Sequence, residues 1–376
     1  MLWVFLFLAG YPYVVYPVLV RLLAVIRARP PHRAVFEPTV TVVIAAYNEA
    51  DVIEQTVLNK LAQQYPEDKL DVIVVSDGSD DETDQIVNRL AVPGSRVRLI
   101  RQEPRQGKTA ALNRAVSTAD SDIIVFSDAN SRYAADAIAR LMQPLADNRV
   151  GYVTGQMTYT DATGAPAEDG GSAYMRYENS LRRYESRIGS VVGVDGGIDA
   201  VRRSLYVPMN PDQLPDFVLP LNIVESGYRV VYEPDAILFE ESLASGLSEY
   251  RMRVRVALRA LWAIWDKRGL LNPVRFPLFS WQLASHKLLR YLGVFPLLLT
   301  FGVALAGAGD KASHLLVTMV FCIGGIAALL GFMDRFRSNK LFRFLHFFLL
   351  LNLSNLVACV RFLKGEKIVV WRPRLG

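Results

Sequence analysis

The stretch Asp122-Ile-Ile-Val-Phe-Ser-Asp-Ala-Asn130 decides the fold class, because it joins an apolar run to two oxygen-bearing side chains. The residues Ile123–Phe126 are typical of a buried parallel strand. Asp128 and Asn130 follow at its carboxyl end, which is the edge where α/β sheets bind ligands. A carboxylate and an amide oxygen at this position predict a site for a hard divalent cation, Mg²⁺ or Mn²⁺.

The residues around this stretch alternate strand and helix signals, as a doubly wound sheet requires. The expected strands are 39–46, 70–76, 97–101 and 123–126, and the expected helices are 51–64, 81–90, 109–117 and 134–145. After Val150 the alternation weakens. Thr163–Ser172 is rich in glycine, alanine and acidic residues, and is typical of a loop that either connects inertly or gates a substrate cleft. The pattern predicts an α/β domain with a mostly parallel sheet.

The composition places this domain at a membrane. The chain has 376 residues, of which 51% are hydrophobic, more than an ordinary soluble enzyme of this size carries. Four segments without Lys, Arg, Asp or Glu approach the ~20 residues that span a bilayer; they are Met1–Val20, Tyr291–Gly309, Ala312–Met333 and Phe344–Val360. We expect an N-terminal transmembrane helix (1–26), the soluble domain (38–235), amphipathic or interfacial helices (236–287), about three C-terminal transmembrane helices (288–363) and a basic tail (364–376).

Charged residues next to these segments indicate the orientation. The first span is followed by Arg21, Arg27, Arg29 and Arg33. By the positive-inside rule, the soluble domain is cytoplasmic and the protein is a multi-pass protein of the inner membrane. The basic tail favours a cytoplasmic C-terminus, whereas three further spans would place it outside, and this conflict stays open. A cleaved signal peptide is the alternative for the first span, but a basic n-region and a small-x-small cleavage site are missing.

The net charge of +5 comes partly from these membrane flanks. We therefore interpret it as contact with membrane lipid and not as nucleic-acid binding. Cys322 and Cys359 both lie in apolar segments, so that neither a disulfide nor a zinc framework is expected.

Polar residues gather where the predicted strands end. The first strand runs into Tyr47-Asn48-Glu49, the second into Asp77-Gly78-Ser79-Asp80-Asp81, and the fourth into Asp128-Ala129-Asn130. If the strands are parallel, these clusters share one crevice, which is the geometry of a nucleotide site. Ser79 and Asp81 fit equally well as caps of the next helix. Lys108, at a predicted helix start, either reaches a phosphate or is a solvated surface residue.

Taken in order, these clusters resemble the family 2 glycosyltransferases, the inverting nucleotide-sugar enzymes with a GT-A fold. The similarity covers Thr39 to about Arg255, and its segments are Ala46–Glu49, Val75–Thr83, Gly107-Lys108, Ser127–Asn130, Gly193–Gly197 and Leu214–Pro220. The flanking spans are similar to those of membrane-bound polysaccharide synthases. The resemblance implies a Rossmann-like GT-A domain inserted between transmembrane helices.

The resemblance also implies a role for each matched residue. Those beside the nucleotide, expected to be UDP, are Tyr47, Asn48, Glu49 and Asp77, with Lys108 near the phosphates. Asp128 would hold the metal that bridges the diphosphate, with Asn130 where the family usually has a second Asp. The loop beside the acceptor is Asp195, Gly196 and Gly197. Asp216 would be the catalytic base that accepts the proton of the acceptor hydroxyl, and a helix N-cap is its alternative role.

The last motif of the family, Gln-x-x-Arg-Trp, is altered in this chain. Met252 stands at the Gln position and Val256 at the Trp position, while Arg255 keeps the Arg. Arg253 and Arg255 either clamp the diphosphate or form a basic amphipathic face on lipid. Because the missing Trp stacks on the acceptor sugar in processive synthases, Val256 favours short products.

The sequence therefore predicts a membrane-bound, inverting glycosyltransferase. It would move a sugar from a nucleotide-sugar donor to a saccharide or lipid-linked acceptor, in the synthesis of a cell-surface polysaccharide. The alternatives are a polyprenyl-phosphate glycosyltransferase and an inactive scaffold that binds the other subunits of an export complex.

Overall fold

The computed structural model describes residues 1–160, 170–241, 246–337 and 339–368. Contacts divide the chain into two compact units. The sheet unit comprises residues 23–242 together with the residues from 368 onward, and the helical unit comprises residues 1–22 together with 243–367.

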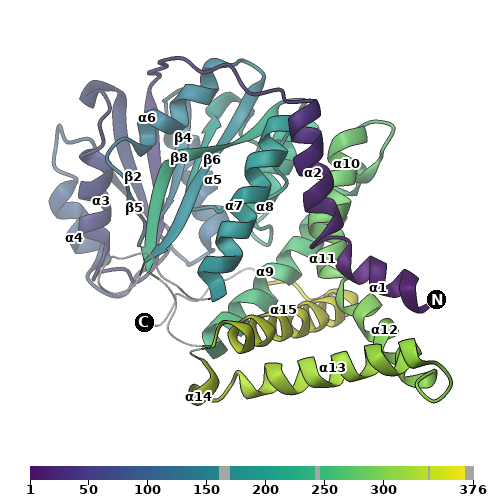
Figure 1. The fold of residues 1–376 in the computed structure, drawn as a ribbon. Helices are drawn as coiled ribbons and strands as arrows, with labels where there is room; N and C mark the ends of the chain where they lie inside the picture. The colour runs from purple at the N-terminus through teal and green to yellow at the C-terminus, as the bar shows by residue number, and fades with distance from the viewer. Residues whose placement is uncertain (161–169, 242–245, 338, 369–376) are drawn as a thin grey trace. The chain divides into compact units, whose positions relative to one another are not determined.

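The sheet unit is built on an eight-stranded sheet in the order β3-β2-β1-β4-β7-β6-β8-β5 (Figure 1). Its strands are β1 (Val40–Ala46), β2 (Leu70–Ser76), β3 (Val97–Arg101), β4 (Ile123–Asp128), β5 (Arg132–Tyr133), β6 (Val150–Thr160), β7 (Ile198–Arg202) and β8 (Arg229–Glu241). The first four strands are parallel to one another, and so are β6 and β8, whereas β5 and β7 run antiparallel to their neighbours. The predicted α/β fold with a mostly parallel sheet is confirmed.

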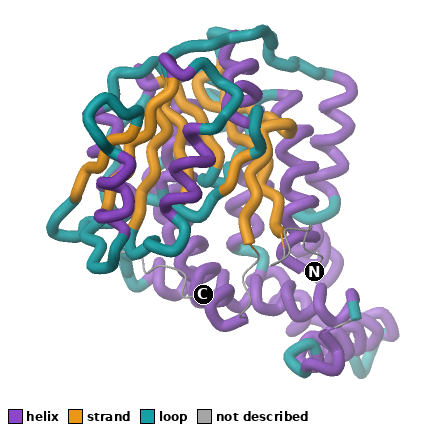
Figure 2. The backbone as a smooth tube through the Cα atoms, turned by 90° about the vertical axis from the view of Figure 1, so that its left-hand side faces the viewer, coloured by secondary structure: helices purple, strands orange, loops and turns teal. Residues whose placement is uncertain are grey.

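Helices pack on both faces of this sheet (Figure 2). They are α3 (Ile53–Leu61), α4 (Thr83–Leu90), α5 (Lys108–Thr118), α6 (Ala137–Met142), α7 (Gly170–Ile188) and α8 (Pro215–Glu225). Ile53 and Val57 of α3, Val87 of α4 and Ile138 of α6 share one apolar core with the sheet. The strand order turns back between β3 and β4, from one edge of the parallel strands to the other side of β1, and the usual right-handed crossover puts the connecting helix α5 on the opposite face. Expected helix 134–145 is shorter than predicted, because a 3₁₀ turn, Gln143–Ala146, follows α6.

The long strands β6 and β8 are the main elements that the sequence pattern does not predict. Most of β6 is buried, so that its residues show no apolar and polar alternation. Its Gly155 suggests a turn, but a Cβ there would lie 2.5 Å from the carbonyl oxygen of Ala236, so glycine allows β8 to approach. β8 also continues past the domain boundary predicted at residue 235.

The predicted loop Thr163–Ser172 lies partly outside the described residues. Residues 163–169 belong to a part of the chain that the structure does not describe. Gly170–Ser172 begin helix α7 and are not part of a loop. The loop prediction is therefore wrong for these last residues.

The helical unit contains the apolar segments. Its helices are α1 (Leu2–Gly10), most of α2 (Val15–Ile26), α9 (Gly246–Asp266), α10 (Pro277–Leu283), α11 (Leu289–Tyr291), α12 (Val294–Ala306), α13 (Ala312–Leu330), α14 (Asp334–Arg337) and α15 (Lys340–Leu363). Within the described residues, α13 and α15 are each long and apolar enough to cross a membrane. Two bent pairs also qualify if each forms a single span: α1 with α2, at 54°, and Pro277–Tyr291 with α12, at 60°.

Candidate active site

The carboxyl ends of β1, β2 and β4 lie level with one another. Ala46 of β1 pairs with Ser76 of β2, and Ala45 pairs with Asp128 of β4. The three polar clusters predicted from the sequence therefore lie along one edge of the sheet.

The loops after β1 and β2 are tied together by side-chain hydrogen bonds. The Asn48 side-chain amide donates to Asp80 Oδ1 at 2.5 Å, and the Asp80 backbone N–H donates to Asn48 Oδ1 at 3.0 Å. Asp81 accepts from the backbone N–H of Thr83, the first residue of α4, at 2.9 Å. Ser79 Oγ accepts from the Asn48 N–H at 3.2 Å. The N-cap residue of α4 is Glu82, so the capping role is wrong for both residues: Asp81 holds the Thr83 N–H, and Ser79 links the two loops.

Asp77 is buried and positions the loop that leads into α5. Its carboxylate accepts hydrogen bonds from the backbone N–H groups of Gln106 and Gly107, at 2.8 and 2.9 Å. On the same loop, the Arg105 guanidinium lies over the ring of Tyr47, 3.4 Å from its centroid. Contacts of Tyr47, Asn48, Glu49 and Asp77 with a nucleotide stay predictions.

Lys108 is the first residue of α5 and joins two predicted site carboxylates. Its ammonium donates to Asp128 Oδ1 at 2.7 Å and lies 3.6 Å from Asp216 Oδ1. Burial lowers the pKa of Lys108, but the two carboxylates outweigh burial and raise this pKa above its usual value. The alternative of a solvated surface lysine is therefore wrong.

Asp216 lies against the glycine loop that was predicted to face the acceptor. It is the second residue of α8, after Pro215, and the N-cap residue is Leu214, so the N-cap role is wrong for Asp216. Gly196 has φ +81, and a Cβ on it would lie 2.2 Å from Asp216 Cγ. Glycine is needed here both for its backbone conformation and for the close contact with the carboxylate.

Gly197 lies close to Asp128, as Gly196 lies close to Asp216. A Cβ on Gly197 would lie 3.5 Å from Asp128 Oδ2 and 3.4 Å from Ser131 Oγ. Ser131 Oγ is buried and has no hydrogen-bond partner among the described residues. Asn130, between them in the chain, is exposed. Asp128 Oδ2, at the end of β4, and Ser131 Oγ, three residues later, thus both lie beside Gly197 at this edge.

These oxygens fit a divalent cation that is shared with a diphosphate. The described part of the chain contains no group of three His, Cys, Asp or Glu side chains that could hold a metal by themselves. Mg²⁺, however, is commonly bound through one or two carboxylates together with substrate phosphates. Asp128 supplies such a carboxylate, and Asn130 is the neutral ligand predicted beside it.

Asp195 pairs with a buried arginine that the sequence does not point to. Both of its carboxylate oxygens lie 2.6 Å from the guanidinium of Arg182 on α7. Arg182 also donates to the carbonyl oxygen of Gly193, at 3.0 Å. Asp195 therefore anchors the glycine loop on α7, and contact with an acceptor stays a prediction for Asp195, Gly196 and Gly197.

Asp199, on β7, is a second site-proximal residue that sequence reasoning misses. It is 1% exposed, and its Oδ1 has no hydrogen-bond partner within the described chain. Burial raises the pKa of Asp199 to about 7, and the negative charges of Asp216 and Asp195 act in the same direction. An aspartate in the middle of an apolar strand is the only signal that could have identified it.

Arg253 and Arg255 belong to α9 in the helical unit. The Arg253 guanidinium lies over the ring of Phe347 on α15, 4.3 Å from its centroid. Farther along α9, the Trp262 indole N–H donates to the carbonyl oxygen of Glu366 at 2.8 Å. Contact of the two arginines with a diphosphate stays a prediction.

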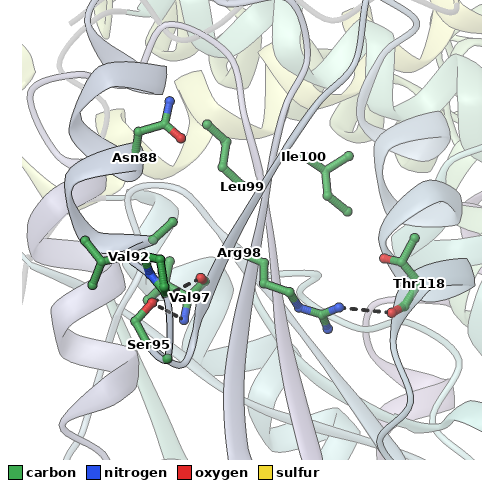
Figure 3. Close-up of a pocket in the computed structure, with 11 residues that line it drawn as sticks. Asn88, Val92, Ser95, Val97, Arg98, Leu99, Ile100 and Thr118 are labelled. Atoms are coloured by element: carbon green, nitrogen blue, oxygen red, sulfur yellow. Dashed lines mark hydrogen bonds between the residues drawn. The ribbon is translucent and has the colours of Figure 1, made fainter.

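A surface cavity of about 620 Å³ lies beside the edge strand β3 (Figure 3). Arg98 crosses it and donates to the carbonyl oxygen of Thr118 at 3.3 Å. The described residues that line it include none of the predicted site residues. We therefore place the candidate active site at the carboxyl edge of β1, β2 and β4 and not in this cavity.

The chain is similar to known proteins in sequence and in fold. Residues 41–206 match the family described as Glycosyl transferase family 2. The chain is 27% identical over 278 residues to the poly-beta-1,6-N-acetyl-D-glucosamine synthase of Staphylococcus aureus strain MSSA476, covering 70% of this chain and 64% of the synthase. It is also 27% identical over 233 residues to the probable glycosyltransferase YdaM of Bacillus subtilis, covering 58% of this chain and 54% of that protein. The chain thus spans less than two thirds of these relatives.

One solved structure matches nearly the whole chain. It is a mannosyltransferase from Pyrobaculum calidifontis in complex with GDP-Man and Mn²⁺, with a TM-score of 0.73 and 25% identity, covering 97% of this chain and 100% of the mannosyltransferase. The family match, the relatives and this shared fold agree with the site geometry, and residues 41–206 form a family 2 glycosyltransferase domain.

Proposed function

We propose that this enzyme transfers a sugar, with inversion, from a nucleotide-sugar donor to a saccharide or lipid-linked acceptor at a membrane. The observation that carries the proposal is the position of Lys108, whose ammonium lies 2.7 Å from Asp128 and 3.6 Å from Asp216. In this proposal Asp128 binds metal and diphosphate, and Asp216 takes the proton of the acceptor. The groups for both halves of the transfer reaction therefore meet at the Lys108 ammonium.

Each group has a defined part in this reaction. The acceptor oxygen attacks the anomeric carbon while its proton passes to a carboxylate oxygen of Asp216. The bond between the anomeric carbon and the diphosphate oxygen breaks, and the nucleoside diphosphate leaves. Lys108 is placed to donate to that diphosphate. A divalent cation at Asp128 and Asn130 would, when bound, neutralise its charge.

Several features support a membrane location and a polysaccharide product. The helices α13 and α15 suit bilayer spans, and a relative is named as a poly-beta-1,6-N-acetyl-D-glucosamine synthase. We propose an inner-membrane enzyme with a cytoplasmic catalytic domain, from the arginines that follow the first span. An inactive scaffold is disfavoured, because Lys108, Asp128 and Asp216 are assembled in ion-pair contact.

A donor panel tests the proposal. The full chain in detergent, with Mn²⁺, is incubated with UDP-linked sugars, which the sequence favours, and with GDP-Man, the ligand of the solved neighbour. We expect one donor to release its nucleotide and Asp216→Asn to slow transfer by about 10²–10⁴-fold without weakening donor binding. If no donor is consumed with any divalent cation, or if Asp216→Asn is fully active, the proposal fails.

A further inference from the structure

A buried lysine lies directly behind the loop that carries Asp128 and Asn130. Lys60 on α3 is 0% exposed, and its Nζ donates to the carbonyl oxygen of Ser131 at 2.5 Å. Nζ also donates to Asn59 Oδ1 at 3.1 Å and lies 3.7 Å from the centroid of the Tyr133 ring. Of the three donors of this ammonium, two are thus taken up by oxygen atoms, and the charge lies over the face of an aromatic ring.

Two other α3 side chains hold the same loop. Thr56 Oγ1 donates to the carbonyl oxygen of Ala129 at 2.6 Å. Asn59 donates to the carbonyl oxygen of Tyr133 at 3.0 Å and accepts from its N–H at 2.7 Å. Residues three and four apart share a helix face, so Thr56, Asn59 and Lys60 form one surface, which we call the α3 clamp. Every bond of the clamp to the loop goes to backbone atoms.

Tyr133 extends the clamp to the glycine loop. Its hydroxyl lies 2.8 Å from the carbonyl oxygen of Gly197, the residue that faces Asp128 Oδ2. Burial lowers the pKa of Lys60, and the carboxylate of Asp128 acts in the opposite direction. Lys60 and Asp128 are therefore coupled by charge as well as through the loop between them.

We propose that Lys60 is a positioning residue for metal and diphosphate binding. This role rests on the proposed function: the hydrogen bond from Lys60 to the Ser131 carbonyl oxygen fixes the backbone that presents Asp128 and Asn130. Without this bond the Ser131 carbonyl is buried and unsatisfied, and the loop relaxes toward another donor. Residues that orient metal ligands without touching the metal typically change metal affinity by 10–100-fold.

The test is Mn²⁺ binding by the full chain in the presence of UDP, measured as free Mn²⁺ by electron paramagnetic resonance. Lys60→Met keeps the length of the side chain and removes its donors, and Thr56→Val removes one clamp bond with almost no change in shape. We expect Lys60→Met to weaken Mn²⁺ binding by about 10–100-fold and Thr56→Val to weaken it by less. The Mn²⁺ concentration for half-maximal activity should rise in the same order.

Gln63→Met is the matched control. Gln63 is also buried and follows α3, but the only bonds that its amide donates go to the backbone carbonyl oxygens of Ala134, beyond the clamp, at 2.9 Å and of Asn59, within its own helix, at 3.3 Å among the described residues. The Gln63→Met variant should have a lower melting temperature and unchanged Mn²⁺ binding. Normal Mn²⁺ binding by a folded Lys60→Met protein, or by Thr56→Val if Lys60→Met does not fold, would overturn the proposal. An equal loss in Gln63→Met would do the same, because the effect would then be general loosening.

Failure of the underlying function gives a different result. If the wild-type chain binds no Mn²⁺ with UDP or with GDP, the metal site itself is wrong, and the role of Lys60 falls with it. If the wild type binds Mn²⁺ and the clamp variants bind it equally well, the metal site stands and the Lys60 proposal alone is wrong.

Discussion

Replacing Gly196 by alanine tests the position of the proposed base without altering the base itself. The new Cβ would lie 2.2 Å from Asp216 Cγ and 2.5 and 2.6 Å from its two carboxylate oxygens. Contacts this short cannot persist, and the carboxylate is the flexible partner. We therefore expect the Asp216 side chain to rotate away from Lys108 and from the acceptor.

The expected cost divides into two parts. The backbone of Gly196 has φ +81, where an L-residue costs roughly 1–2 kcal/mol. This part lowers stability. The displaced carboxylate is the second part, and it affects the rate, because losing a general base slows transfer by about 10²–10⁴-fold. Donor affinity should persist, since Asp216 acts on the acceptor.

Gly227→Ala separates the two parts. Gly227 has φ +88, yet a Cβ there would meet no atom within 4 Å. It carries the same kind of backbone strain and none of the contact with Asp216. Both variants should therefore melt a few degrees below the wild type, and only Gly196→Ala should lose activity.

The assay is nucleotide release under saturating donor and acceptor, together with donor binding by calorimetry. Equal activity of the two variants would refute the reasoning, because the carboxylate position would then be irrelevant to the rate. Loss of donor binding in Gly196→Ala would refute it as well, by placing the glycine loop on the donor side.

Three further predictions concern metal, pH and product length. Asp128→Ala should abolish metal-dependent nucleotide binding with the fold intact, and full activity in EDTA would contradict a metal role. Burial raises the pKa of Asp199 from 3.8 to about 7 in the folded chain, so its stabilising contribution is complete below about pH 4 and is lost as the pH rises through 7. The free energy of unfolding, measured from pH 5 to pH 8, should therefore fall more steeply with pH for the wild type than for Asp199→Asn. The two slopes should differ by at most about 1.4 kcal/mol per pH unit, and parallel curves would rule this out. Val256 is 37% exposed and cannot stack on a sugar as Trp does, so mass spectrometry should find short products, whereas a ladder of tens of sugars would contradict this.

Most of the first half of the sheet could be predicted from the sequence. Strands β1, β2 and β4 are apolar runs bounded by polar clusters, and that pattern is sufficient when both faces are buried. β6 and β8 could not be predicted in the same way. The glycine at position 155 of β6 is explained by neighbours on other strands, the Ala236 carbonyl oxygen and Ile198, which the local sequence does not reveal.

The site residues divide along a similar line. Asp128 and Asp216 could be predicted because each stands in a motif at an element boundary. Lys60 and Arg182 could not be predicted, because each lies inside a helix and its partner lies outside that helix. The partner of Lys60 is Ser131, 71 residues further along the chain, and the partner of Arg182 is Asp195 in the glycine loop. The spacing of residues along a helix shows which side chains share a face, but not which loop that face will meet.

The described contacts also show that two aspartates at equivalent strand ends can have different roles. Asp77 follows β2 and Asp128 ends β4, yet the carboxylate of Asp77 is taken up mainly by backbone N–H groups of the loop before α5, with Gln102 and Arg105 beside them, whereas that of Asp128 faces an ammonium and a glycine. A carboxylate whose acceptors are filled by backbone fixes a loop; one whose partner is a lysine can exchange that partner for a metal or a diphosphate. Lys108 connects the two kinds, because Asp77 holds the loop that begins its helix while its ammonium holds Asp128. The charge at the site is therefore set by a residue whose own position depends on the neighbouring strand.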